Sequence, residues 1–503
     1  MRRLITMVAC SWLLACGGTG ETGVGGHGAG GGGQAGAGGD EGTGGEGGSY
    51  EMVVSWMACE PSGAECATID VPADWEARRG ATLPFFVRRV LRPNARGQLW
   101  LLQGGPGAAG DGWLGALPYF AQIAPDLDVY MPDHRGTGQS ARLTCNLDDV
   151  TTCVADLTRG VGATLPHFTT TAAARDVGEV IAHVREADEA VFVIGASYGT
   201  YWAHRYLQVF PSQASGVVLD SPCAPGTCDY SIFQDAAAND VGHDLLDACG
   251  ADTFCASKLG SDPWTRLSAL LDDLDVGHCP EIGATRADLR EFLFSLALST
   301  YTRAYVPATI YRLERCDPAD VTVITHLAMA VGGGGGDDDS WSDALHFHVV
   351  LSELLPSPPP TVAEVEANLA PLFIAPNAAL DYASSAPIWP VYPRDSHVGA
   401  FATTDTPLLI LSGTLDPATS PPVAAPLASH FTGAHQHFVS VARAAHGVMF
   451  NDACAAGIAA GFFADPTSTP DTSCTTTTPP VDFDGSSQLN QMFLGQSDAY
   501  END

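Results

Sequence analysis

One serine stands in a setting that could make it a nucleophile. Residues 195–199 read Gly-Ala-Ser-Tyr-Gly, directly after the apolar run 190–194 and at the start of a helical pattern over 198–209. Small residues two positions before and after a serine permit a tight strand-to-helix turn, which exposes the hydroxyl at the carboxyl end of a sheet. The motif therefore predicts that Ser197 is the nucleophile of an acyl-transfer reaction.

Because a hydroxyl is a poor nucleophile near neutral pH, this chemistry also needs a base and an orienting acid. The chain supplies them downstream in the order serine, carboxylate, histidine. Asp416 follows the apolar run 407–411. His446 follows the apolar run 438–441. Both runs are short and flanked by turn residues, as buried strands are, so we expect Asp416 and His446 to complete a triad with Ser197.

The intermediate of acyl transfer carries an oxyanion, which needs backbone N–H donors. Tyr198, the residue after the serine, should give one of them. The second should come from the loop 103–107, Gln-Gly-Gly-Pro-Gly, whose glycines let the backbone approach a substrate carbonyl. We expect the N–H of Gly104 or Gly105 in this role, with a slight preference for Gly105. This mechanism needs neither a metal ion nor an organic cofactor.

The elements that must position these residues alternate along the chain. Strands followed by helices indicate a mostly parallel sheet covered on both faces. The alternation breaks between residues 221 and 405, where helix formers predominate, so this stretch is expected to be an inserted helical cap. Strands are predicted within 99–102, 127–131, 190–194, 216–219, 407–411 and 438–441, and helices over 172–185 and 198–209.

Three motifs in one order carry a family resemblance. Residues 103–107, then 133–140 (Asp-His-Arg-Gly-Thr-Gly-Gln-Ser), then 195–199 resemble the proline iminopeptidase and tripeptidyl aminopeptidase family, and above all its secreted tripeptidyl aminopeptidase branch. The resemblance extends over about residues 53–474 and is weakest in the cap. It implies an α/β-hydrolase fold. We expect the segment 133–140 to brace the site rather than to take part in the reaction.

The resemblance also implies an activity, a serine peptidase that releases residues from the free N-terminus of peptides. Two departures bear on this expectation. Gln103 stands where proline iminopeptidases usually have histidine, and their cap glutamates that bind the substrate amine have no match in this chain. An esterase acting on small acyl esters is the alternative, since the same triad serves both reactions. A non-catalytic surface binding protein on a hydrolase scaffold is a second alternative.

The beginning of the chain has the features of an export signal. Residues 1–15 combine two early arginines with an apolar run too short to span a bilayer. The string Leu-Leu-Ala-Cys that ends at Cys16 resembles the lipobox of bacterial lipoproteins, which implies lipidation of Cys16 and anchoring to a membrane of the cell envelope. An ordinary signal peptide cut elsewhere is the alternative. The Gly-rich residues 16–49 are predicted to be a flexible tether.

The remaining chain divides into four segments. Residues 50–220 and 406–475 are expected to form the two parts of the hydrolase domain, with the cap at 221–405 between them. Residues 476–503 form an acidic tail that we expect to be loosely ordered, because its composition is rich in Thr, Pro and Asp.

The cysteines fit an oxidising compartment. Of the 14 cysteines, Cys10 and Cys16 lie in the export region, which leaves an even number for disulfides. Spacing suggests local pairs, although it does not fix the connectivity. The suggested pairs are Cys59 with Cys66, Cys145 with Cys153, Cys223 with Cys228, Cys249 with Cys255, Cys279 with Cys316, and Cys454 with Cys474.

The charge of the chain limits its partners. A formal net charge of −35, from 23 basic and 58 acidic residues, argues against nucleic-acid binding, because such proteins neutralise phosphates with Lys and Arg. The partners that we expect are a peptide or a small acyl substrate, and a membrane through the lipid anchor.

Overall fold

The structure is a computed structural model that describes residues 50–332 and 340–502. The predicted signal peptide, the lipidation site Cys16 and the Gly-rich tether lie outside these residues. Among the helices that are described, none combines the length and the apolar character that crossing a membrane requires.

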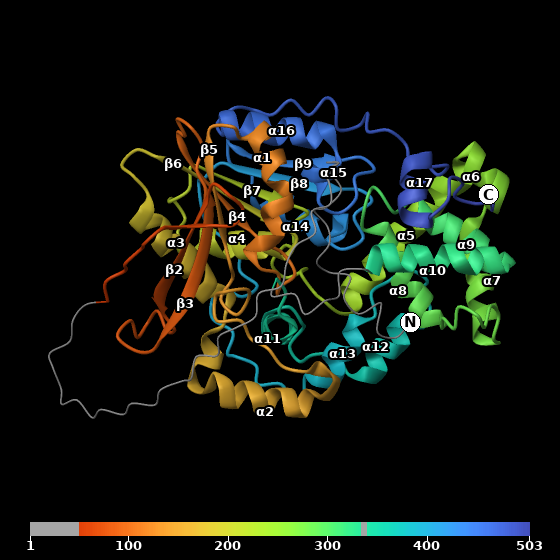
Figure 1. Ribbon diagram of the computed structural model, residues 1–503, viewed down its shortest axis with the longest axis horizontal. Coiled ribbons are helices and arrows are strands. Elements are labelled where there is room, and N and C mark those ends of the chain that lie inside the picture. The colour runs from red at the N-terminus through yellow and green to blue at the C-terminus, as the bar shows by residue number, and fades with distance from the viewer. Residues whose placement is uncertain (1–49, 333–339, 503) are drawn as a thin grey trace, which may run out of the picture.

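A mostly parallel sheet forms the centre of the described chain (Figure 1). Its nine strands have the order β1-β2-β3-β5-β4-β6-β7-β8-β9. The first three strands and the β3–β5 pair are antiparallel, and all later pairs are parallel. The strands are β1 (Met57–Cys59), β2 (Ala64–Pro72), β3 (Thr82–Val90), β4 (Gly97–Leu102), β5 (Leu127–Pro132), β6 (Ala190–Ala196), β7 (Gly216–Asp220), β8 (Leu408–Gly413) and β9 (Gln436–Val441).

Successive residues of the central strands face two separate apolar layers. On β6, Val191 and Val193 belong to one layer, whereas Phe192 and Ile194 belong to the other. Helices therefore cover both faces of the sheet, as in other parallel sheets. The first face packs against α3 (Thr170–Val184), α4 (Tyr198–Val209) and α14 (Pro421–His430), and the second against α1 (Leu117–Ile123) and α16 (Ala453–Ala464). The remaining helices outside residues 221–405 are α2 (Val150–Gly160), α15 (Val448–Asn451), α17 (Ser487–Leu494) and the 3₁₀ helices η1 (Gly110–Ala116), η2 (Leu147–Asp149) and η3 (Gly162–His167).

The predicted fold class is confirmed, and all six predicted strands are present as β4 to β9. Helix α3 begins two residues before the predicted start, because the Thr169 hydroxyl oxygen accepts the N–H of Ala172 and caps the helix there. Strand β2 lies largely within residues 59–71, which resemble the Cys-containing opening strand of the family, whereas its hairpin partner β3 is not among the predicted strands. Its residues vary between buried and exposed, and charged side chains interrupt its apolar pattern.

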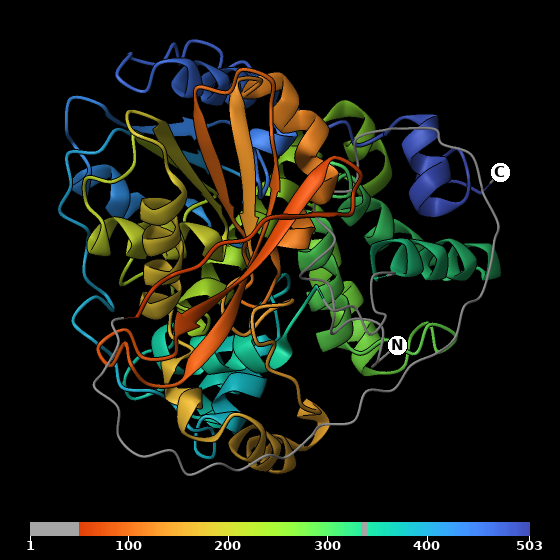
Figure 2. The same cartoon turned by 60° about the vertical axis from the view of Figure 1, so that its left-hand side comes forward.

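Only helices occur in the described part of residues 221–405, between β7 and β8. The first six helices build a core of their own around Leu246, Leu267 and Leu293. The helices of this stretch are α5 (Ile232–Ala251), α6 (Thr253–Leu259), α7 (Pro263–Asp275), α8 (Arg286–Ala297), α9 (Tyr305–Arg315), α10 (Pro318–Gly332), α11 (Asp343–Glu353), α12 (Val362–Leu369) and α13 (Ala378–Ser385). Helices α5 to α10 lie on the side of the sheet away from β2 and β3, whereas residues of α11 and α13 join the apolar layer that covers the first face of the sheet (Figures 1 and 2). We refer to the whole stretch below as the proposed cap.

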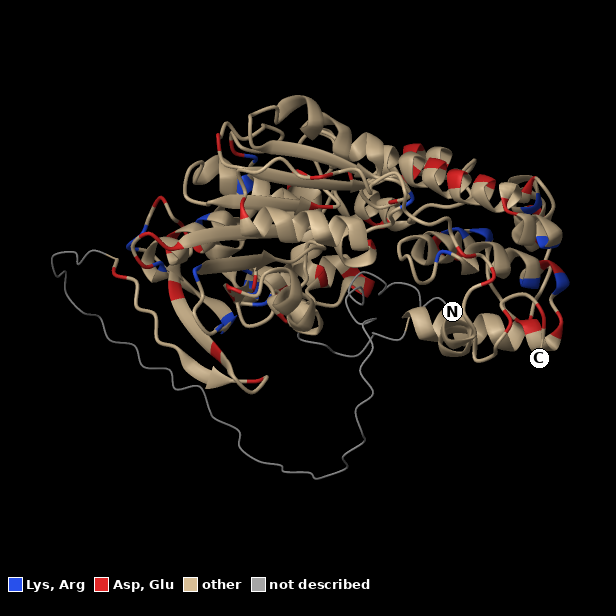
Figure 3. Ribbon diagram, turned by 90° about the horizontal axis from the view of Figure 1, so that it is seen from above, with Lys and Arg blue, Asp and Glu red and all other residues tan. Residues whose placement is uncertain are grey.

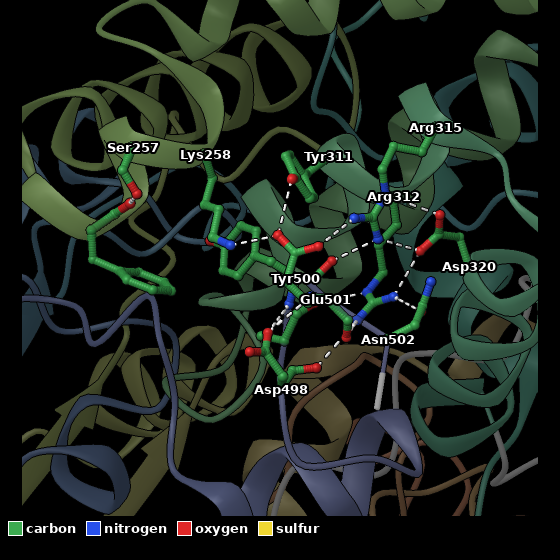
Figure 4. A network of polar contacts seen from close by, with 12 residues as sticks. Ser257, Lys258, Tyr311, Arg312, Arg315, Asp320, Asp498, Tyr500, Glu501 and Asn502 are labelled. Carbon is green, nitrogen blue, oxygen red and sulfur yellow. Dashed lines mark hydrogen bonds and ion pairs between the residues drawn. The ribbon is translucent and has the colours of Figure 1, made fainter.

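The expectation of a loosely ordered tail is wrong. Figures 1 and 2 show α17 beside α9 and α10 of the proposed cap, and the end of the chain is held by a polar network there (Figure 4). The buried Arg312 donates hydrogen bonds to the carbonyl oxygens of Ala499 (2.8 Å) and Glu501 (2.7 Å) and pairs with Asp320. Tyr500 is fully buried. A composition poor in apolar residues is thus compensated by the buried Arg312 and by two buried rings, Phe483 and Tyr500.

The structure joins the described cysteines in the six pairs that the spacing suggests, with Cα–Cα distances between 4.9 and 5.8 Å. The described residues contain one group of three side chains close enough to share a metal ion, Cys279, Glu281 and Cys316. Two of these are the partners of a disulfide, so they do not offer thiolate ligands.

The negative charge is spread over the molecule. In Figure 3, Asp and Glu occur on both the sheet-containing part and the helices of the proposed cap, with Lys and Arg interspersed.

Candidate active site

The turn that carries Ser197 has the strained geometry that the sequence motif predicts. Ser197 lies between β6 and α4 with φ 56° and ψ −128°, a region that L-residues rarely occupy. The residues two positions before and two positions after Ser197 must be glycines. A Cβ atom on Gly195 would lie 2.0 Å from the carbonyl oxygen of Gly199, and one on Gly199 would lie 2.2 Å from the carbonyl oxygen of Leu102. The turn therefore fixes a partly exposed serine at the carboxyl end of the sheet.

Asp416 lies past the end of β8, His446 lies past the end of β9, and the two side chains contact each other. Nδ1 of His446 is 2.9 Å and 3.0 Å from the two carboxylate oxygens of Asp416. The fully buried carboxylate also accepts the N–H groups of Ala418 and Thr419 and the hydroxyl of Thr419. These donors fix the orientation of the carboxylate, which in turn orients the imidazole.

The electrostatics of this pair suit a base. Burial alone would raise the pKa of Asp416 and lower the pKa of His446. Their mutual attraction and hydrogen bonds outweigh burial, so the pKa of Asp416 lies below its usual value and that of His446 above. With the Nδ1 proton directed at Asp416, Nε2 of His446 is the nitrogen that can accept a proton from a hydroxyl.

The loop 103–107 lies against the serine, as expected of an oxyanion loop. A Cβ atom on Gly104 would lie 3.6 Å from Oγ of Ser197. The N–H of Gly104 already donates to the Gln103 side chain at 2.8 Å, which leaves Gly105 as the better of the two candidate donors. Tyr198 is the first residue of α4, where a backbone N–H has no partner within its own helix.

The segment 133–140 braces the neighbouring loops. The carboxylate of Asp133 accepts the N–H groups of Gly110 and Gln139. Arg135 is buried and pairs with Asp176 at 2.6 Å. These contacts agree with a supporting role, because both charged side chains are already bound to partners within the fold.

Comparison with known proteins relates two segments of the chain to known families. Residues 99–247 match the model of the alpha/beta hydrolase fold family, and residues 376–474 match the model of the TAP-like proteins. The chain thus contains an α/β-hydrolase segment and a TAP-like segment. This TAP-like hydrolase has the predicted α/β-hydrolase fold, and the two matches support the predicted resemblance to the tripeptidyl aminopeptidase family.

Two curated relatives are the tripeptidyl aminopeptidases of Streptomyces lividans and Streptomyces coelicolor. Each is 27% identical to this TAP-like hydrolase over 263 residues, which is 43% of this chain and 48% of the relative. The chain thus spans about half the length of these relatives. A solved structure in the comparison is the proline iminopeptidase of Mycobacterium smegmatis, with 15% identity, 80% of this chain and 98% of that chain covered, and a TM-score of 0.37. The reaction itself has to be argued from the site.

Helices of the proposed cap contact each loop of this TAP-like hydrolase's candidate centre. Just before α5, the hydroxyl of Tyr230 donates to the carbonyl oxygen of Gly105 at 2.8 Å. On α5, Nε2 of Gln234 donates to the carbonyl oxygen of Ala418 at 2.8 Å. After α8, the carbonyl oxygen of Leu298 accepts the N–H of His446. The proposed cap therefore closes around the serine, the acid and the base together.

Helices of the proposed cap also carry three acidic side chains that sequence reasoning missed, and one of them, Asp235, is buried. Asp235 on α5 directly follows Gln234, and one of its carboxylate oxygens has no hydrogen-bond partner among the described residues. Burial raises the pKa of Asp235 well above its usual value and the pKa of Glu291 on α8 to about 7. Asp381 on α13 interacts electrostatically with Glu291. The three come from distant parts of the sequence, so no local pattern could have shown that they gather beside the site.

Proposed function

We propose that this TAP-like hydrolase is an exported serine peptidase that removes residues from the free N-terminus of peptides, with Ser197, His446 and Asp416 as its triad. The observation that carries the proposal is the Asp416–His446 pair, held in one orientation by hydrogen bonds, in a sheet whose strand β6 leads into the strained turn of Ser197. The names of the curated relatives support the choice of peptides as the substrate class.

The proposed reaction has two acyl-transfer steps. Nε2 of His446 takes the proton of Ser197 as Oγ attacks the carbonyl carbon, and the N–H groups of Tyr198 and Gly105 bind the oxyanion. The imidazolium, held by Asp416, then gives its proton to the leaving amine as the C–N bond breaks. A water molecule, activated by His446 in the same way, hydrolyses the acyl-enzyme and releases the serine.

The acidic cluster of Asp235, Glu291 and Asp381 supports selectivity for a free N-terminus. A carboxyl group whose pKa is raised by burial gains most from an added positive charge. The ammonium group at the start of a peptide supplies that charge, and an N-acetylated peptide does not. Asp235 lies on α5 and Glu291 on α8, and these helices or the residues next to them contact the oxyanion loop, the acid loop and the base loop, so a bound ammonium would lie close to the scissile bond.

The test of this function compares one peptide set in free and N-acetylated form. We expect cleavage near the N-terminus of the free peptides only, followed by mass spectrometry of the products. Asp235→Asn should lower kcat/KM for free peptides by about ten- to hundredfold, since a hydrogen bond between charged groups is worth about 1.5–3 kcal/mol. The matched control is Asp240→Asn, the same change at an exposed position of the same helix, and it should leave kcat/KM unchanged.

Two results would contradict this assignment. Equal cleavage of free and acetylated peptides would remove the role of the acidic cluster. No cleavage of either form by a protein that hydrolyses small acyl esters would make the enzyme an esterase instead.

We also propose that the enzyme is lipid-anchored through Cys16 on the outer side of a membrane. The six disulfides of the described chain support export to an oxidising compartment. The full chain, expressed in bacteria fed an alkyne fatty acid, should carry the label and sediment with membranes. Cys16→Ser should abolish both, and Cys10→Ser, the matched control, should retain both. An unlabelled, soluble wild-type protein would rule out the anchor.

A further inference from the structure

The end of β7 carries two buried polar residues that the proposed triad does not include. The carbonyl oxygen of Asp220 accepts the N–H of Ser197 at 3.0 Å. The hydroxyl oxygen of Ser221 accepts the N–H of Gly447, the residue after the base, at 2.8 Å. Both residues are 0% exposed. The strand between the serine strand and the acid strand thus holds the backbone on both sides of the proton transfer.

The hydrogen bond that the side chain of Asp220 accepts does not require a charged group. One carboxylate oxygen accepts the N–H of Met449 at 3.2 Å. The other is buried and has no hydrogen-bond partner among the described residues. A neutral asparagine could accept the Met449 N–H equally well, so the acid must be explained by its charge.

The groups that face this carboxyl are the triad pair and the start of α15. Burial raises the pKa of Asp220 to about 7, the N–H groups of Met449 and Val448 and the charge of His446 lower it, and the charge of Asp416 raises it. In return, the charge of Asp220 raises the pKa of His446. The two groups therefore interact across the interior, in addition to the direct contact between His446 and Asp416.

We propose that Asp220 is a positioning residue that acts on His446 as a second carboxylate, stabilising the imidazolium that forms when the base takes the proton of Ser197. The proposal rests on the proposed serine mechanism. Asp416 fixes the direction of the imidazole, and Asp220 adds negative charge without touching the reacting atoms. An opposite charge in a buried site favours the charged form of its neighbour, so the base is stronger while Asp220 is ionised.

Loss of the Asp220 charge should move the pH profile of kcat/KM in one direction. The free enzyme needs His446 in its neutral form, so the acid limb of kcat/KM reports the pKa of this histidine. Removing the charge of Asp220 lowers that pKa. The acid limb of Asp220→Asn should therefore move to lower pH by about half a unit to one unit, with a plateau about three- to tenfold lower, because one pKa unit corresponds to a factor of ten in stabilisation.

The matched control is Ser221→Ala, which removes a hydrogen bond to the same loop and leaves the charge of Asp220 in place. Its plateau should fall, whereas its acid limb should stay where the wild-type limb is. We would record kcat/KM and the rate of inactivation by a fluorophosphonate between pH 5 and pH 9, which is roughly the range in which His and a raised carboxyl titrate. An unshifted acid limb in Asp220→Asn overturns the proposal.

A second measurement covers the case in which Asp220→Asn does not fold. In the wild-type protein, the carboxyl carbon of Asp220 should titrate near pH 7 by ¹³C NMR, with a matching inflection in the ring signals of His446. Titration at the ordinary value for aspartate overturns the proposal. A wild-type protein whose Ser197 does not react with the fluorophosphonate overturns the serine mechanism as well, so the two failures are distinguishable.

Discussion

Ser197→Ala should eliminate labelling by a fluorophosphonate and lower kcat/KM on the best substrate by at least about ten-thousandfold, as loss of the nucleophile does in other serine hydrolases. In the proposed reaction, Oγ of Ser197 is the atom that forms and breaks the bond to the acyl group. Alanine is small enough for the space between β6 and α4 and shares the unfavourable φ of 56° with serine. We therefore expect unchanged thermal unfolding.

The measurement combines intact-protein mass spectrometry after labelling with steady-state kinetics. The matched control is Ser429→Ala, the same change at an exposed serine of α14, which should label and cleave as the wild type does. If Ser197→Ala still hydrolysed peptides at the wild-type rate, the reaction would have to be assigned to another site of the molecule.

The core of the fold could be predicted because each central strand is an uninterrupted apolar run. Every residue of β4 and β8 is buried, so the sequence there needs no alternation, and the turn residues that follow mark the carboxyl end. Ser197 and Asp416 were proposed as site residues for the same reason, since each follows such a run, whereas His446 follows β9, which is only partly buried. The position of a residue after a buried strand is a local property that the sequence records.

Contacts between distant segments cannot be predicted from a local sequence pattern. Asp235, Glu291 and Asp381 are ordinary acidic residues of three helices, and only the packing of those helices shows that Asp235 is buried and that Glu291 interacts with Asp381. The tail shows the same limit, because its order depends on Arg312, far earlier in the chain. Composition shows what a segment can bury by itself, whereas here Arg312, from another part of the chain, supplies the hydrogen bonds that hold the tail.

Strand β3 went unpredicted for a different reason. Its residues are partly exposed and include Arg88 and Arg89, which are paired with Asp111 and Glu65. A strand at the side of a sheet has one face for such pairs, so its apolar pattern is broken. Strand predictions based on apolar runs therefore favour the centre of a sheet over its edge.

Asp416→Asn should lower kcat by about ten-thousandfold and leave the reactive serine in place, as the same change does in other triads. The asparagine keeps the shape, and its amide nitrogen would donate toward Nδ1 of His446. The imidazole must then carry its proton on Nε2, which points at Ser197 and can no longer accept a proton. The loss should exceed that of Asp220→Asn by far, since Asp416 contacts the ring at 2.9 Å.

The control for this change is Asp405→Asn. Asp405 is an exposed aspartate just before β8, the strand that Asp416 follows, and its variant should behave as the wild type does. Steady-state kinetics at the pH optimum and at high pH separate two explanations. A loss that hydroxide partly relieves at high pH is expected if the wrong tautomer of His446 is the cause, because hydroxide can then remove the serine proton. A loss of less than about tenfold would contradict the role of Asp416 as the orienting acid, and the fully buried Asp220 would be the remaining carboxylate in electrostatic contact with the base.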